Sequence, residues 1–284
     1  METLLLVTGT YRLYNLIKIA KSINKYYDEY INKFNIEWLI CIDQIHAIGN
    51  IDDVINYLKT TNIKYNISYI NINKDKIYGG DLFNSSLEYF VMTNNVNPWV
   101  YILDDDNLLH PSLFNTFNVC LNNSFYNNKE IILLTLKWDD TYIREINENT
   151  LGIPDKNNFI EGEHMIDPSA VILKFNIIKK YGMFSNIYLY DFKWLNPLIR
   201  EEQKLNNVIF YHYYSGYDKG YVNSYHNAIR DLDNIKSYNE NINNLIIDVH
   251  FSNMDVIKHS AYVPILSNNI KEKIYQLVLD ELKK

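Results

Sequence analysis

The strongest chemical signal in the sequence is a run of three acids, Asp104 to Asp106, that directly follows the apolar segment 99–103. Three neighbouring carboxylates repel one another unless a positive charge lies close to them. Mg2+ or Mn2+ can supply that charge, because these cations prefer oxygen ligands, bind one or two protein carboxylates and fill the remaining positions with phosphate oxygens and water. The run therefore predicts a site for a cation and a phosphate-bearing ligand. A solvated acidic turn, or an N-cap for a helix expected around 111–121, is the alternative.

A cation at this run would suit a reaction in which a nucleoside diphosphate leaves. When a sugar is transferred, the metal stabilises the charge that develops on the diphosphate as the glycosidic bond breaks, and a remaining acid can hydrogen-bond a ribose hydroxyl. The net charge of -7 argues against nucleic acid as a partner, since binding to a polyanion draws on clustered Lys and Arg. We expect no nucleic acid partner.

The elements that must position these acids alternate short apolar runs with helical periodicity. Strands are expected over 4–7, 38–42, 67–72 and 99–103, with amphipathic helices over 13–27, 51–58 and 83–91 between them. Repeated β-α units imply a mostly parallel sheet with helices on both faces. Ligands of such sheets bind beyond the carboxyl ends of the strands, so residues 8–12, Asp43 and residues 104–107 are expected along one edge.

From about Lys129 the pattern is that of an α+β region, with strand-like runs over 131–136, 170–174 and 208–211 and a last amphipathic helix over 270–282. A single domain over 1–284 is expected at this length. Cys41 and Cys120 lie in apolar stretches and are expected to be buried thiols. The apolar run 4–7 is too short to span a bilayer, so we expect no membrane anchor and a cytoplasmic location, with an upstream targeting segment left open.

Three blocks of the sequence resemble a known family. They are Val7-Thr8-Gly9-Thr10-Tyr11, Trp38-Leu39-Ile40-Cys41-Ile42-Asp43 and Tyr101-Ile102-Leu103-Asp104-Asp105-Asp106-Asn107, the last followed by Leu113-Phe114. In order and approximate spacing they are similar to the β-1,3-glucuronyltransferase family, glycosyltransferase family 43. The resemblance implies a GT-A (nucleotide-diphospho-sugar transferase) fold, a UDP-sugar donor, Mn2+ and inversion at the anomeric carbon. It also implies a nucleotide-sugar-binding half over 1–128 and an acceptor-binding half over 129–284.

Carried over residue by residue, the resemblance places Tyr11 and Asp43 against the uracil ring. It places Asp104 and Asp105 on the uridine and makes Asp106 the metal ligand, with Asp104 a second candidate ligand.

Thr8 and Thr10 follow the first expected strand at the ligand edge and are therefore candidates to contact the nucleotide, and the resemblance matches Asn84 to a family asparagine. Tyr78 and Phe83 stand where the family carries arginines. A carboxylated sugar would need a bidentate cation at such positions, so the departure weakens the case for a glucuronic acid donor. A neutral hexose or pentose is at least as consistent with these residues.

An inverting transfer needs a carboxylate that takes the proton from the acceptor hydroxyl on the face opposite the leaving nucleotide. Asp191 is the candidate base, because it lies in the aromatic segment 188–194, about where the family places its catalytic acid residue. The family uses Glu there, and a surface Asp that starts a helix is the alternative. The segment 161–167 is a candidate for acceptor contacts, and a second metal there is not favoured.

A Gly- and Tyr-rich segment over 211–226 contains further candidates. His212 directly follows an expected strand and could complete the metal or diphosphate site, His226 is the second candidate, and Lys219 could contact a phosphate. A hydrogen-bonded structural histidine is the alternative for either imidazole.

The sequence thus predicts a glycosyltransferase that uses Mn2+ or Mg2+ to move a sugar from a UDP-sugar to a hydroxyl acceptor such as a glycan. Two other interpretations remain. A sugar-phosphate nucleotidyltransferase has a similar sheet but usually begins with a Gly- and Arg/Lys-rich phosphate loop, which residues 8–12 lack. A catalytically silent nucleotide- or carbohydrate-binding protein could keep the same fold. The donor sugar, the acceptor and the oligomeric state are not indicated.

Overall fold

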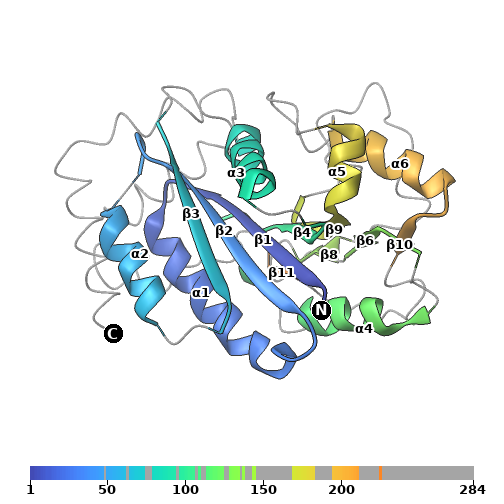
Figure 1. The fold of residues 1–284 in the computed structure, drawn as a ribbon, viewed down its shortest axis with the longest axis horizontal. Coiled ribbons are helices and arrows are strands. Elements are labelled where there is room, and N and C mark those ends of the chain that lie inside the picture. The colour runs from blue at the N-terminus through green and yellow to red at the C-terminus, as the bar shows by residue number, and fades with distance from the viewer. Residues whose placement is uncertain are drawn as a thin grey trace.

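The computed structural model describes residues 1–47, 49–61, 64–73, 79–93, 96–105, 108–109, 113–124, 128–134, 136–137, 143–144, 168–182, 194–210 and 224–225. Within this part of the chain the molecule is a mixed α/β structure with a central sheet between two layers of helices (Figure 1).

The central sheet has seven strands among the described residues, in the order β10-β6-β9-β4-β1-β2-β3. Its strands are β1 (Thr3–Thr10), β2 (Asn35–Asp43), β3 (Asn66–Ile72), β4 (Trp99–Ile102), β6 (Ile131–Leu133), β9 (Val171–Lys174) and β10 (Val208–Phe210). Strand β9 runs antiparallel to its neighbours β4 and β6, and the other pairings in this sheet are parallel. The prediction of a mostly parallel sheet is confirmed.

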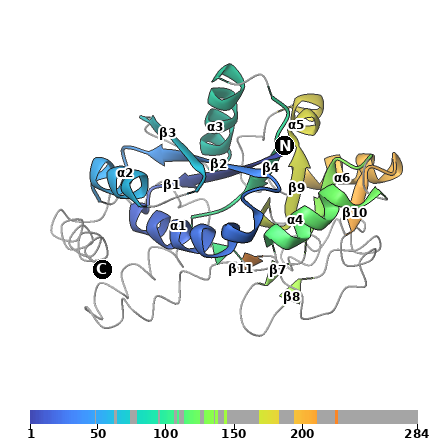
Figure 2. The same cartoon turned by 60° about the horizontal axis from the view of Figure 1, so that its bottom comes forward.

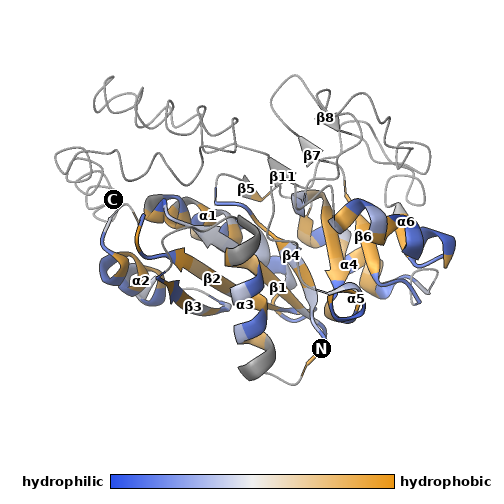
Figure 3. Ribbon diagram, turned by 90° about the horizontal axis from the view of Figure 1, so that it is seen from above, coloured by the Kyte–Doolittle hydropathy of each residue, from blue (hydrophilic) through white to orange (hydrophobic). Residues whose placement is uncertain are grey.

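Helices cover both faces of this sheet, as the alternating β-α pattern predicts (Figure 2). One face carries α1 (Leu13–Tyr27), the short 3-10 helix η1 (Asp28–Tyr30), α2 (Ile51–Thr60) and α4 (Leu113–Asn122); the other carries α3 (Gly79–Thr93), α5 (Phe175–Tyr181) and α6 (Asn196–Lys204). Strands β1 and β2 are buried on both sides along most of their length, which explains why they read as continuous apolar runs rather than as alternating ones. Figure 3 shows apolar residues concentrated along the strands and on the inner sides of the helices.

A smaller sheet joins segments that are far apart in the sequence. Its strands are β5 (Leu108–Leu109), β7 (Leu136–Lys137), β8 (Ile143–Arg144) and β11 (Ser224–Tyr225), in the order β5-β11-β7-β8. Strand β11 pairs antiparallel with β5, so that Tyr225 lies opposite Leu108. The late part of the chain therefore returns to the segment that directly follows the acidic run.

The expected strand over 131–136 is divided between the two sheets. Residues 131–133 form β6 of the central sheet, the Leu134 amide still donates to the carbonyl of Ala170 at 2.8 Å, and Leu136 belongs to β7 of the smaller sheet. Residues 168–170 form a 3-10 turn, η3 (Pro168–Ala170), so β9 begins one residue later than predicted.

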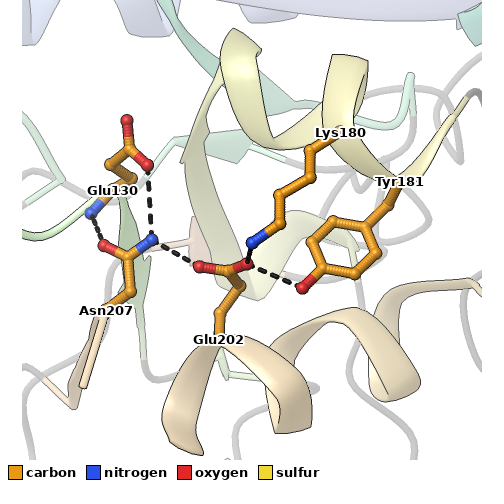
Figure 4. Close-up of polar contacts among 5 residues, drawn as sticks. All are labelled: Glu130, Lys180, Tyr181, Glu202 and Asn207. Atoms are coloured by element: carbon orange, nitrogen blue, oxygen red, sulfur yellow. Dashed lines mark hydrogen bonds and ion pairs between the residues drawn. The ribbon is translucent and has the colours of Figure 1, made fainter. Parts of the chain in front are cut away.

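A polar network braces the part of the fold where α5 and α6 lie, at the ends where β6 and β10 begin (Figure 4). The Glu202 side chain is 1% exposed and accepts hydrogen bonds from Lys180 Nζ at 2.6 Å, the Tyr181 hydroxyl at 2.7 Å and Asn207 Nδ2 at 2.5 Å. The Asn207 carboxamide continues to Glu130, whose backbone amide donates to Asn207 Oδ1 at 2.8 Å. Because three of these contacts satisfy the buried Glu202 carboxylate, the network joins α5 to α6 and joins α6 to the residues where β6 and β10 begin.

Both cysteines are buried thiols outside any disulfide, as predicted. Burial raises the pKa of the Cys120 thiol to about 12. In the part of the chain that the structure describes, no helix combines the length and the apolar character needed to cross a membrane.

Candidate functional site

The carboxyl ends of β1, β2 and β4 meet along one edge of the sheet. Parallel pairing places Thr10 of β1 opposite Ile42, the residue before Asp43, and places Val7 opposite Ile102, the last residue of β4. The Leu103 amide donates to the Val7 carbonyl at 2.9 Å and keeps the chain beside β1 as it enters the acidic run. Polar residues predicted from three separate strands thus lie along a single edge.

Arg12 and Thr10 hold the middle carboxylate of the acidic run. The Asp105 side chain accepts a hydrogen bond from the Thr10 hydroxyl at 2.7 Å and from Arg12 Nε at 3.0 Å, both at Oδ2, while the second guanidinium branch of Arg12 donates to Oδ1. Asp105 is 4% exposed, so this charge is removed from water and neutralised by an arginine in a bidentate pair.

The turn between β1 and α1 positions this arginine. The Arg12 amide donates to the Thr10 hydroxyl at 2.9 Å, and the carbonyl of Arg12 accepts from the Asn15 amide at 2.9 Å as α1 begins. The guanidinium carbon of Arg12 also lies 5.1 Å from the centre of the Tyr11 ring, within range of a cation-π contact. Tyr11 and Arg12 therefore form one ordered surface at the start of α1.

Thr8 lies below this edge. It has no exposed surface, and its hydroxyl accepts a hydrogen bond from Trp38 Nε1 at 3.0 Å between neighbouring strands. The indole, which is also fully buried, needs such a partner. Thr8 thus supports the strands beneath the edge, and its contact with a nucleotide stays a prediction.

Asp43 and His46 form a second buried pair at the same edge. The Asp43 carboxylate accepts from the His46 backbone amide at 3.1 Å through Oδ1, and its Oδ2 lies 2.7 Å from His46 Nδ1. Both residues are 6% exposed. If Nδ1 carries the proton that it donates to Asp43, the Nε2 atom of the imidazole is an acceptor.

Helix α3 covers the opposite face of β1 and lies unusually close to it. A Cβ atom on Gly9 would lie 2.9 Å from Cβ of Leu82, so glycine is required for the helix to reach this position. Phe83 is 3% exposed and belongs to the hydrophobic core on this face of the sheet. A residue in that place contacts core side chains rather than a donor. Asn84 is partly exposed on the same helix.

The structure describes two acids of the run, of which Asp105 is buried and Asp104 is partly exposed. One or two carboxylates are enough for Mg2+ or Mn2+ when phosphate oxygens complete the shell, so Asp104 fits such a cation by its chemistry. No group of three or more His, Cys, Asp and Glu side chains suited to a metal is found among the residues whose placement is described. A cation here would depend on further ligands from elsewhere.

Several predicted site residues lie outside the described residues. They are Asp106, Asp191, His212 and Lys219, together with His226, Tyr78 and the segment 161–167. Their roles remain predictions.

Arg12 and His46 were missed as site residues by the sequence reasoning. The signal for Arg12 was present, since three adjacent acids require a counter-charge and Arg12 follows a strand that ends at the same edge. The counter-charge was assigned entirely to a metal ion. His46 gave no comparable signal, because its role depends on the turn that brings it back to Asp43.

Comparisons with protein-family models and with curated proteins found no match to this chain. Solved structures of similar shape include Staphylococcus aureus TarS 1-349 in complex with UDP-GlcNAc, at 12% identity and a TM-score of 0.47 over 79% of this chain. They also include the mannosyltransferase PcManGT from Pyrobaculum calidifontis in complex with GDP-Man and Mn2+, at 12% identity and a TM-score of 0.48 over 72% of this chain. The chain spans 58% and 53% of those two proteins. Similarity at this level assigns no function, which must be inferred from the residues at the edge of the sheet.

Proposed function

We propose that this protein is a metal-dependent glycosyltransferase of the GT-A type that moves a sugar from a UDP-sugar to a hydroxyl acceptor. The observation that carries the proposal is the convergence of Tyr11, Asp43 and the acidic run at the carboxyl edge of a mostly parallel sheet. This is the edge at which open α/β sheets bind their ligands. The strand order β4-β1-β2-β3, with helices on both faces, makes this sheet one of that open α/β kind.

In the proposed site, the Tyr11 ring and Asp43 bind the uracil, with Thr10 and Asn84 beside the donor. Tyr11 presents an aromatic face on which a base can stack. The Asp43 carboxylate is already oriented by His46 at 2.7 Å, so it needs little reorganisation to accept an N–H from the base. This arrangement would select a base that offers an N–H donor, as uracil does.

Asp104 and Asp106 would hold Mn2+ or Mg2+ together with the diphosphate. When bound, the cation supplies the positive charge that stabilises the leaving nucleoside diphosphate. Lys219 would add a second positive charge near the phosphates. His212 was the first candidate for a late histidine ligand, but the pairing of β11 with β5 supports His226 more strongly, because His226 directly follows Tyr225 and Tyr225 lies opposite Leu108.

Asp191 would act as the base on the acceptor side. It would accept the proton of the acceptor hydroxyl as the oxygen attacks the anomeric carbon from the face opposite the nucleotide, which inverts the configuration. The aromatic residues on either side of Asp191 in the sequence could bind the acceptor sugar and limit access of water.

Two activity assays and one binding measurement distinguish the proposal from its alternatives. The purified protein is incubated with a panel of UDP-sugars, with and without Mn2+, and hydrolysis to UDP is measured in the absence of an acceptor. We expect Mn2+-dependent release of UDP from at least one donor. Turnover of a nucleoside triphosphate with a sugar phosphate, without turnover of UDP-sugars, would identify a nucleotidyltransferase instead. Binding of UDP without any turnover would identify a silent binding protein.

A further inference from the structure

We propose that Arg12 keeps Asp105 out of the cation site, so that the acidic run offers a divalent cation two carboxylates and not three. The inference rests on the proposed function, and it assigns Asp105 a positioning role in place of the predicted contact with uridine.

The contacts of Asp105 leave it little capacity for a further ligand. A carboxylate oxygen has about two acceptor positions. At Oδ2, one position is taken by the Thr10 hydroxyl at 2.7 Å and the other by Arg12 Nε at 3.0 Å, while Oδ1 accepts from the second guanidinium branch. A cation or a ribose hydroxyl could bind Oδ2 only by displacing one of these donors, and at Oδ1, which has one position left, it would have to lie beside the guanidinium.

Burial makes such a displacement unfavourable. The side chains of Arg12 and Asp105 are 13% and 6% exposed. Displacing Asp105 from Arg12 would break a largely buried ion pair, which is strongly destabilising. The pair also joins residues 93 positions apart in the sequence, so it fixes the acidic run to the start of α1.

Electrostatics gives the pairing a consequence for the cation. Asp104, Asp105 and Asp106 together with Arg12 have a formal charge of -2, which one divalent cation balances. Without Arg12, the Asp105 carboxylate would lose its counter-charge. Arg12 therefore sets the charge of the site and holds its geometry before the metal binds, as a positioning residue.

A double-mutant cycle on Mn2+ binding tests the inference. Free Mn2+ is measured by electron paramagnetic resonance, without nucleotide, for the wild type, Arg12→Met, Asp105→Asn and the double variant Arg12→Met/Asp105→Asn. Asp52→Asn, an exposed acid at the start of α2, is the matched control for loss of one charge. Thermal melts identify any variant that does not fold, and Arg12→Gln then replaces Arg12→Met in the cycle.

The expected order follows from the pairing. Arg12→Met removes a positive charge from the site and tightens Mn2+ binding by about tenfold, Asp105→Asn removes a negative charge and weakens it by a similar factor, and the double variant returns to within about threefold of the wild type. If Asp105 is itself a ligand, the double variant will bind Mn2+ as weakly as Asp105→Asn, and the inference is wrong.

A second titration tests whether Asp105 contacts the uridine. UDP is titrated into the Mn2+-saturated double variant, whose affinity we expect to stay within about threefold of the wild type. A loss of about tenfold or more with intact Mn2+ binding would place Asp105 on the nucleotide and overturn the inference alone. A wild-type protein that binds no Mn2+ would overturn the proposed function and the inference together.

Discussion

The Nδ1 atom of His46 lies 2.7 Å from Oδ2 of Asp43 at the carboxyl end of β2, and the same carboxylate accepts the His46 backbone amide at 3.1 Å. Asp43 and His46 are three residues apart in the sequence, and the turn after β2 brings their side chains together. Asp43 is therefore an oriented acceptor at the edge where the proposed base would bind.

Replacing Asp43 should weaken binding of UDP more than replacing His46. For Asp43→Ala we expect about a tenfold loss of affinity, since a hydrogen bond to a charged acceptor is removed, and for His46→Ala about threefold, since the acceptor remains but loses its support. Calorimetric titration with UDP and Mn2+ measures both. Asp28→Asn, an exposed acid paired with Lys64 at 2.8 Å, is the control. Equal losses in Asp43→Ala and the control would remove Asp43 from the base site.

Gly9→Ala should destabilise the fold and disturb the site. Its Cβ would lie 2.9 Å from Cβ of Leu82, an atom close to the helix backbone, so α3 must move away from β1. We expect a loss of about 1–3 kcal/mol in the free energy of unfolding, together with weaker UDP binding because Asn84 moves with the helix. Urea denaturation and calorimetry measure the two effects.

Gly182→Ala is the matched control for Gly9. Its Cβ would meet nothing within 4 Å, but its backbone φ of +85° is strained for alanine. We expect a loss of about 1 kcal/mol in stability without any change in UDP affinity. Unchanged stability of Gly9→Ala would mean that α3 does not pack as closely as described.

The hydrogen bonds that Glu202 accepts should contribute to stability near neutral pH. Glu202→Gln replaces a charged acceptor of three hydrogen bonds and should lower the free energy of unfolding by about 1–3 kcal/mol near neutral pH. Glu201→Gln is the control, because Glu201 is 55% exposed and its bond to Lys204 at 2.6 Å is a surface pair worth little. A similar loss in both variants would contradict the structural role of the network.

The pH dependence of this contribution has a definite sign. Burial alone would raise the pKa of Glu202, but its hydrogen bonds from Asn207, Lys180 and Tyr181 outweigh burial and hold the pKa below its ordinary value of 4.5. A depressed carboxylate pKa contributes stability that is fully present above the unfolded value and is lost as the pH falls through the folded value. Lowering the pH from about 6 to about 3 should therefore reduce the stability of the wild type more than that of Glu202→Gln, and thermal melts across this range measure both. Parallel curves would show that another group controls the acid transition.

Much of the first half of the fold could be predicted from the sequence, because its strands are continuous apolar runs and its helices have regular three-and-four spacing. The predicted helix over 13–27 matches α1, and β2, α2, β3, α3, β4 and α4 are each found within a few residues of their predictions, whereas η1 and β5 were not predicted. The edge of the sheet could be predicted for the same reason, since parallel strands deliver their following residues to one side.

The second half was harder to predict because its elements are short and their partners are distant. Helices α5 and α6 contain 7 and 9 residues and gave no extended periodicity. The antiparallel direction of β9 depends on the chain between it and β6, which carries no simple pattern. At the site, Arg12 was missed because the pairing with Asp105 depends on tertiary structure, although the need for a counter-charge was visible in the acidic run.

The most direct test of the central claim is a calorimetric titration of UDP into the wild type and Asp106→Ala, with Mn2+ present and with Mn2+ removed by chelation. The proposed function predicts that UDP binds the wild type with Mn2+ and that its affinity falls by about tenfold or more both on chelation and on the Asp106→Ala substitution. UDP affinity that is the same with and without Mn2+, and the same in Asp106→Ala, would contradict a metal-dependent nucleotide-sugar site at the acidic run.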